Sequence, residues 1–129
     1  MGTWGPGSFS NDAALDWLAD LIEGEPKLLD LALDNALGAA ALTDPVCTAA
    51  LVAAELVAAA LGLGDERLNE AAATWLDMHR DSVRLLGPVK ARRAVQRVYE
   101  DSELRELWDE AGRPEWHADV RELLSRLGR

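Results

Sequence analysis

The sequence has few of the residues that favour β-strands or that support metal and redox chemistry. Among its 129 residues, isoleucine, phenylalanine and cysteine occur once each, and histidine occurs twice. The single cysteine, Cys47, excludes an intrachain disulfide, and its apolar neighbours give no indication of an activated thiolate. Two histidines leave few imidazole ligands for a transition metal. The scarcity of isoleucine and phenylalanine, with no run of alternating apolar residues, argues against a β-sheet.

The sequence also lacks recognisable targeting and membrane-spanning segments. The N-terminus has no basic region followed by an apolar run, so we expect no signal peptide. The longest apolar stretch, residues 43–63, is barely long enough to cross a bilayer. It also carries Glu55 near its centre, where a carboxylate is costly in lipid. Together with a reduced cysteine, these features predict a cytoplasmic protein without a membrane span.

Positive charge is scarce in most of the chain, and the formal net charge is -10. Residues 1–79 carry a net charge of -11, residues 80–97 a net charge of +5, and residues 98–129 a net charge of -4. A negative surface repels nucleic acid phosphates and anionic lipid, and it favours basic or neutral partners. We therefore expect no binding to nucleic acid or membrane, and a basic protein as the partner.

Alanine and leucine dominate what is present, and both favour helices. Apolar residues recur at helical spacing, and glycine and proline divide the chain into about seven segments. We predict an all-α protein that forms a single compact domain over residues 1–129. The second helix is predicted to run to about Ala41. The predicted starts of the helices are Ser10 or Asn11, Pro26, Pro45, Asp65, Pro88, Asp101 or Ser102, and Pro114.

The segment 45–61 is apolar on nearly every side, and Thr48 and Glu55 are its only strongly polar side chains. A helix without a polar face is expected to be surrounded by its own protein. We therefore predict that this Ala- and Leu-rich helix is the buried centre of the domain.

The remaining helices are amphipathic, with one apolar stripe each. Residues predicted to face inward include Trp17 and Ile22 in the first helix, Ala40 in the second, and Leu107 and Ala111 in the sixth. Ahead of the first helix, the segment 1–10 is rich in glycine and contains Pro6, so it is predicted to be irregular. It also carries Trp4 and Phe9, and we expect it to pack onto the helical domain.

The N-terminal region resembles a bacterial family classed as a domain of unknown function, DUF number 4259. Pro6 stands where the family pattern has a small polar residue, which is a mild departure. The similarity extends more loosely to residues 53–57 and 102–112 and to Trp116, so it is expected to span the chain. It implies no activity and supplies no catalytic residues. The positions that carry the resemblance are Trp4, Gly5, Gly7, Phe9, Asn11, Asp12, Ala14, Asp16 and Trp17.

Glu55 is the most informative single residue, because an ionised carboxylate inside a helical core needs a partner. We expect a structural hydrogen bond from a tryptophan N–H, from His79 or from a backbone amide of the N-terminal segment. The alternative is a buried pocket acid with a functional role.

Two aspartates, Asp12 and Asp16, lie one helical turn apart, which is a spacing that two metal-binding carboxylates can use. If Glu55 joined them, a Mg²⁺ or Mn²⁺ site would be conceivable. Helical spacing, however, places both aspartates opposite the apolar stripe, and no nucleophile is placed beside His79 by any motif. No phosphate-binding loop or dinucleotide fingerprint is present either. We therefore expect no metal, no cofactor and no catalytic residue.

One helix face is basic, and it contains Lys90, Arg93 and Arg97. This face could hold a phosphate or an acidic partner. The favoured interpretation is a solvated face whose cations pair with neighbouring acids.

These observations favour a non-enzymatic protein-binding module whose acidic N-terminal half captures a basic partner. One concrete version is an immunity or inhibitor protein that masks the basic active site of a nuclease toxin. A second hypothesis is a hydrolase or metal-dependent enzyme that uses Asp12, Asp16 and Glu55. A third is a structural homo-oligomer, and the sequence leaves the oligomeric state open.

Overall fold

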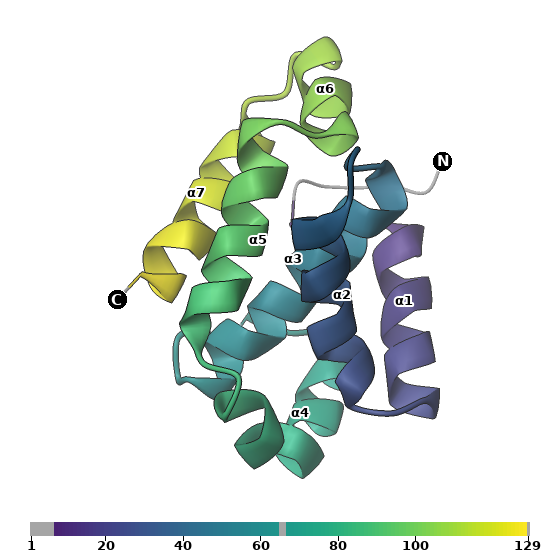
Figure 1. Ribbon diagram of the computed structural model, residues 1–129, viewed down its shortest axis with the longest axis vertical. Coiled ribbons are helices and arrows are strands. Elements are labelled where there is room, and N and C mark those ends of the chain that lie inside the picture. Colours follow the sequence, from purple (N-terminus) through teal and green to yellow (C-terminus); the bar gives the residue numbers. More distant parts are fainter. Residues whose placement is uncertain (1–6, 65–66, 129) are drawn as a thin grey trace.

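The structure, a computed structural model, describes residues 7–64 and 67–128. These residues form seven helices and no strand, which confirms the all-α prediction. None of the helices in this part of the chain is long and apolar enough to cross a membrane. The helices, drawn in Figure 1, are α1 (Asp12–Glu23), α2 (Lys27–Gly38), α3 (Asp44–Ala60), α4 (Glu70–Arg84), α5 (Pro88–Glu100), α6 (Glu103–Glu110) and α7 (Glu115–Leu127).

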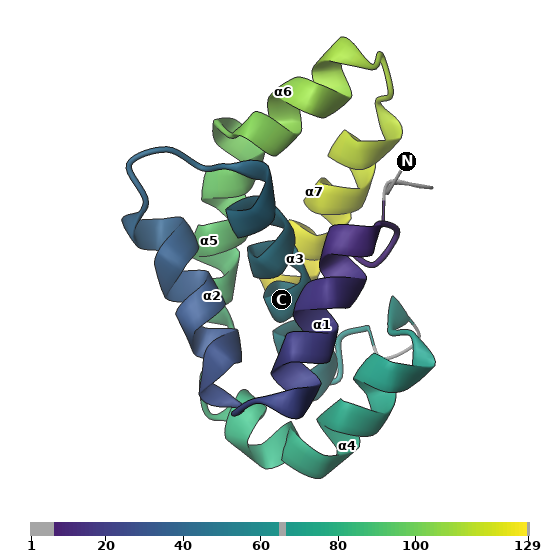
Figure 2. The same ribbon diagram turned by 90° about the vertical axis from the view of Figure 1, so that its right-hand side faces the viewer.

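Helix α3 is the centre of the domain, as predicted. Every residue from Cys47 to Ala60 is buried, and α3 packs against each of the other six helices. In Figures 1 and 2, α1, α2 and α5 run alongside α3, while α4 lies across one end of the molecule and α6 stands at the other. The many alanines of α3 allow its neighbours to approach closely on all sides, so the core is built around one helix.

Asparagine side chains cap two of the helices. The side-chain oxygen of Asn11 accepts a hydrogen bond of 2.8 Å from the amide of Ala14, so the predicted start of α1 is confirmed. Helix α4 begins at Glu70, where the side chain of Asn69 caps it, and the predicted start at Asp65 is wrong. Asparagine and aspartate are both favourable caps, so the residue type alone does not fix the start. The cap used is Asn69, which directly precedes the helix that packs into the core.

Helix α2 ends at Gly38, three residues before the predicted end. Its last carbonyl groups receive hydrogen bonds from the guanidinium of Arg97 in α5, with distances of 2.7 Å to Ala36 and 3.1 Å to Leu37. Beyond the helix, Ala39 has an extended backbone. The end of α2 is therefore capped by a side chain from another helix rather than by a glycine of its own.

Four residues predicted to face inward are exposed in the structure. Ile22 in α1 is 44% exposed, and Leu107 in α6 is 47% exposed. Ala111 at the end of α6 is also exposed, as is Ala40, which lies beyond the end of α2. For the two residues of α6 the reason is the position of the helix, because α6 has no fully buried residue and stands outside the core (Figure 2).

Cys47 lies at the start of α3 with no exposed surface, and burial raises the pKa of its thiol. A buried, protonated thiol does not react until the surrounding helices open. We expect an aromatic disulfide reagent to modify native Cys47 at least about a hundredfold more slowly than the thiol of the denatured chain. Absorbance of the released thiolate gives both rates, and equal rates would contradict the buried position.

Candidate functional site

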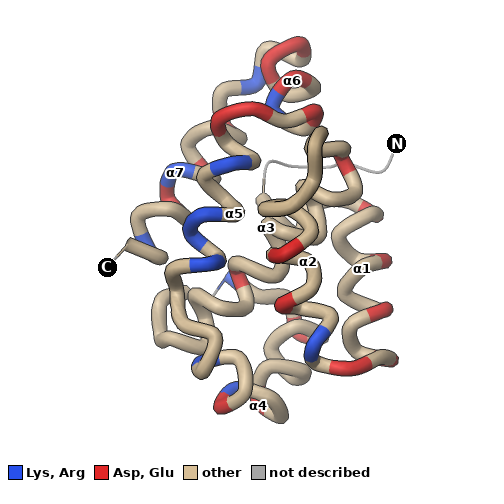
Figure 3. Tube along the Cα trace, in the orientation of Figure 1, with Lys and Arg blue, Asp and Glu red and all other residues tan. Residues whose placement is uncertain are grey.

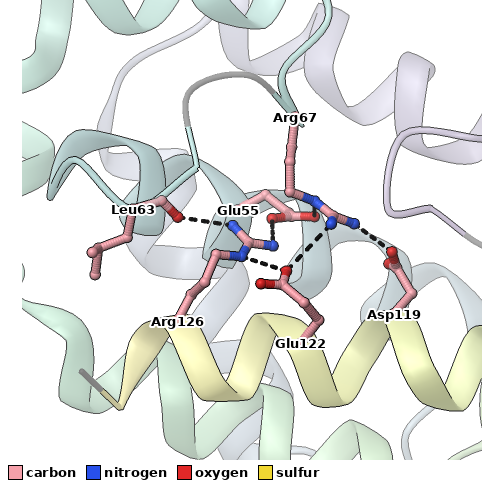
Figure 4. A network of polar contacts seen from close by, with 6 residues as sticks. All are labelled: Glu55, Leu63, Arg67, Asp119, Glu122 and Arg126. Carbon is pink, nitrogen blue, oxygen red and sulfur yellow. Dashed lines mark hydrogen bonds and ion pairs between the residues drawn. The ribbon is translucent and has the colours of Figure 1, made fainter.

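Glu55 is buried in α3, as predicted, with 2% of its surface exposed. Its carboxylate lies between two guanidinium groups (Figure 4). Nη2 of Arg126 in α7 donates a hydrogen bond of 2.7 Å to Oε1, and Nε of Arg67 lies 3.6 Å from Oε2. The prediction of a hydrogen bond from a tryptophan, from His79 or from the N-terminal segment is therefore wrong for the described residues, in which the partners of Glu55 are arginines.

Two further carboxylates surround the arginines. Asp119 pairs with Arg67, and Glu122 accepts hydrogen bonds from both Arg67, at 3.2 Å, and Arg126. We call Glu55, Arg67, Asp119, Glu122 and Arg126 the Glu55 network. It joins the centre of α3 and the α3–α4 connection to α7, which is far from both in the sequence.

Burial raises the pKa of Glu55, and the guanidinium groups of Arg126 and Arg67 oppose that shift. Burial alone would lower the pKa of Arg67, but the carboxylates of Glu55 and Asp119 raise it. Among the described residues, no buried side-chain nitrogen or oxygen lacks a hydrogen-bond partner. Both oxygens of this buried acid face guanidinium groups, so neither is left to contact a ligand. This favours a structural role for Glu55 over the role of a pocket acid.

The described part of the N-terminal signature builds the start of α1. Phe9 and Trp17 pack against the core, and the amide of Ser10 donates a 3.0 Å hydrogen bond to the carbonyl of Gly7. Asn11 is the cap of the helix. The remaining signature positions Trp4 and Gly5 lie outside the described residues.

The structure does not bring the proposed metal ligands together. Asp12 and Asp16 are exposed on the outer face of α1, whereas Glu55 is enclosed by the arginines. Within residues 7–64 and 67–128, no group of three or more His, Cys, Asp or Glu side chains could hold a metal ion. The hydrolase or metal-enzyme hypothesis therefore has no assembled site in this part of the chain.

A groove that the sequence did not predict lies between the N-terminal segment and α6. Its volume is about 490 Å³, which is within the range of small-ligand pockets. Gly7 and Asn11 line it beside Thr48 of α3, and Leu107 and Trp108 of α6 face them. The exposed stripe of α6 thus borders this groove instead of the core.

The basic face of α5 is turned toward α2. Lys90 lies 2.9 Å from a carboxylate oxygen of Asp30 and 2.9 Å from one of Asp34. Arg97 caps α2, and Arg93 is exposed. The interpretation that these cations pair with neighbouring groups is thus confirmed for Lys90, and two of the three are already occupied within the chain.

Four acids of α1 form a continuous outer stripe, Asp12, Asp16, Asp20 and Glu23, which we call the α1 acidic stripe. All four are exposed, and within the described residues none has an ion-pair partner. Figure 3 shows this contrast, with acidic positions along α1 and a run of basic positions on α5. Among the helices of the described residues, the α1 acidic stripe is the largest set of charges of one sign without an ion-pair partner.

Searches of curated proteins and of solved structures found no match to the chain. Residues 2–119 match the profile of a family described as a domain of unknown function, DUF4259. The match covers the N-terminal signature, the central helix and α6, which is the extent expected from the sequence resemblance. The chain therefore belongs to the DUF4259 family.

Proposed function

We propose that this protein is a non-enzymatic binding module that holds a basic segment of another protein against α1. The observation that carries the proposal is the α1 acidic stripe, which is exposed and uncompensated in the described part of the chain. Like charges held together on one helix repel each other, and a basic partner relieves that repulsion.

The distribution of the arginines and lysines supports the same proposal. Arg67 and Arg126 are held in the Glu55 network, Arg97 caps α2, and Lys90 sits between two aspartates. These cations are used inside the fold, so the negative excess of the sequence is left on the surface. A field of one sign speeds the capture of an oppositely charged partner.

Apolar side chains run beside the α1 acidic stripe. Leu15 is 37% exposed and Ile22 is 44% exposed, and Ala19 lies between them at helical spacing. An apolar row flanked by carboxylates matches an amphipathic segment that presents apolar residues beside lysines or arginines. An inhibitor or immunity protein that masks the basic active site of a nuclease is one concrete form of such a module.

A synthetic amphipathic helix of leucine and lysine is the probe for this surface. Neutralising the α1 acidic stripe, with Asp12→Asn, Asp16→Asn, Asp20→Asn and Glu23→Gln, is expected to weaken its binding about a hundredfold at low salt. Fluorescence anisotropy of the labelled peptide measures the affinity, and raising the salt concentration is expected to weaken binding to the unmodified protein.

The matched control removes the same number of charges from another exposed region. Glu100→Gln, Asp101→Asn, Glu106→Gln and Glu110→Gln change the net charge equally, at positions on or next to α5 and α6. We expect this control to weaken peptide binding by less than about fivefold. Equal losses in the two variants would show that only the total charge matters and would reject α1 as the binding surface.

A further inference from the structure

Helix α4 carries an apolar stripe on its outer side that the domain leaves uncovered. Ala71, Thr74 and Met78 of α4 and Leu85, the residue that follows the helix, lie at the spacing of a coiled-coil seam whose remaining position holds Asp81, and all five are exposed. Met78 is 75% exposed and Leu85 is 88% exposed, which is unusual for large apolar side chains. Beside the stripe lies a shallow groove of about 610 Å³ that Ile22 of α1 borders.

We propose that a second copy of this chain covers this stripe, with the two α4 helices packed antiparallel about a two-fold axis beside Met78. Met78 then meets Met78 of the second copy, and the small Ala71 lies near the large Leu85 of the second copy. Because a two-fold axis presents the same surface twice, a face that closes a dimer must be complementary to itself. Pairing a small residue with a large one across the axis meets that requirement.

Charge complementarity identifies the occupant as a second copy. Glu70 and Arg84 lie on the same edge of the stripe, on opposite sides of its midpoint. Antiparallel packing brings Glu70 of each copy near Arg84 of the other, which forms two ion pairs. Within the described residues, neither side chain has an ion-pair partner in its own chain. Asp77 lies near the axis, and Arg80 of the same chain lies 3.6 Å from it and offsets its charge.

The position of the stripe also limits repulsion between two acidic chains. Residues 70–89 contain three acids and two arginines, a net charge of -1, whereas the whole chain carries -10. Two copies that meet through α4 therefore approach through a nearly neutral surface, with the α1 acidic stripe left for another partner.

Sedimentation equilibrium on the full chain tests the proposal. We expect a mass twice the 14.0 kDa of one chain. Met78→Glu places two carboxylates at the axis and is expected to weaken dimerisation at least about a hundredfold. Leu31→Glu, at a position in α2 that is 48% exposed, is the matched control and is expected to leave dimerisation unchanged.

A charge exchange tests the antiparallel arrangement itself. Arg84→Glu is expected to weaken dimerisation at least about tenfold, since the carboxylate introduced in each copy then faces Glu70 of the other. Adding Glu70→Arg to Arg84→Glu restores opposite charges and is expected to recover the affinity to within about threefold. Failure of this recovery in folded variants would overturn the arrangement. A mass of one chain at about 0.5 mM protein would overturn the dimer.

Discussion

Replacement of Arg126 by methionine is expected to lower the free energy of unfolding by about 3–5 kcal/mol. Arg126 is 3% exposed, and its guanidinium donates to Glu55 and to the carbonyl of Leu63 at 3.0 Å. Methionine fills most of the space but leaves a buried carboxylate with only the more distant Arg67. Urea denaturation measures the change, and Arg121→Met, at an exposed position of the same helix, is expected to cost less than about 0.5 kcal/mol.

The same variant has a characteristic dependence on pH. Burial already raises the pKa of Glu55 above its ordinary value of 4.5, and loss of Arg126 removes the main opposing charge. The folded variant therefore binds a proton more tightly than the unfolded chain does. The contribution of Glu55 to the stability of the variant is therefore fully present below pH 4.5 and is lost as the pH rises through the folded pKa. The difference from the unmodified protein should accordingly be larger at neutral pH than at pH 4.5.

Removing the charges of both Glu55 and Arg126 tests whether the unpaired carboxylate causes the loss of stability. The combination of Glu55→Met with Arg126→Met is expected to be more stable than Arg126→Met alone, because no unpaired carboxylate remains. If Arg126→Met instead lost less than about 1 kcal/mol, the network would not hold α7 to α3 as described.

Gly64→Ala is expected to lower the free energy of unfolding by at least about 3 kcal/mol, which is the second large effect on stability. Gly64 has a φ angle of +135°, a conformation that an L side chain rarely adopts. A Cβ atom there would overlap Nη1 of Arg126, well inside van der Waals contact. The substitution therefore strains the backbone and displaces the buried guanidinium at the same time.

Gly62 supplies the matched control for this effect. It has a φ angle of +80°, and a Cβ atom there meets nothing within 4 Å. Gly62→Ala is thus expected to cost about 1–2 kcal/mol, from backbone conformation alone. Combining Gly64→Ala with Arg126→Met removes the overlap. The double variant should therefore lose less free energy of unfolding than the sum of the losses in the two single variants. Thermal and urea unfolding of Gly62→Ala, Gly64→Ala, Arg126→Met and the double variant measure these free energies. Equal losses of stability for Gly62→Ala and Gly64→Ala would argue against the close contact.

The sequence was sufficient to predict the central helix because that prediction rests on local composition. An apolar residue at nearly every position of 45–61 requires burial whatever the neighbours are. The cap at Asn11 and the proline starts of α3 and α5 are local signals too, and the structure agrees with them. The start of α4 could not be predicted in this way, because Asp65 and Asn69 are both good cap residues and only the packing of α4 selects Asn69.

The partners of Glu55 could not be predicted in the same way. Arg126 is 71 residues away in the sequence, and helical periodicity carries no information about which helices meet. One signal was present, because Arg126 stands directly before Leu127 and three residues after Leu123 on a helix that is otherwise apolar on that side. A cation at the edge of an apolar stripe and a lone carboxylate in a buried helix are natural partners.

The exposed apolar residues show a second limit of periodicity. Leu107 and Ile22 fall at inward positions on their own helices, yet each borders a groove. A stripe shows which face of a helix is apolar, and only the arrangement of the other helices shows whether that face meets the core. Leu107 beside the α6 groove and the outer apolar stripe of α4 are both of this kind, because neither of them meets the core.

The cap that Arg97 places on α2 also bears on the order of events during folding. A cap supplied by a neighbouring residue forms as soon as its helix forms, whereas this one joins residues that are 60 and 61 positions apart. The last turn of α2 can therefore be fixed only after α5 has been synthesised and has docked. Closing so long a loop is slow compared with helix formation, so this end of α2 is expected to become native late.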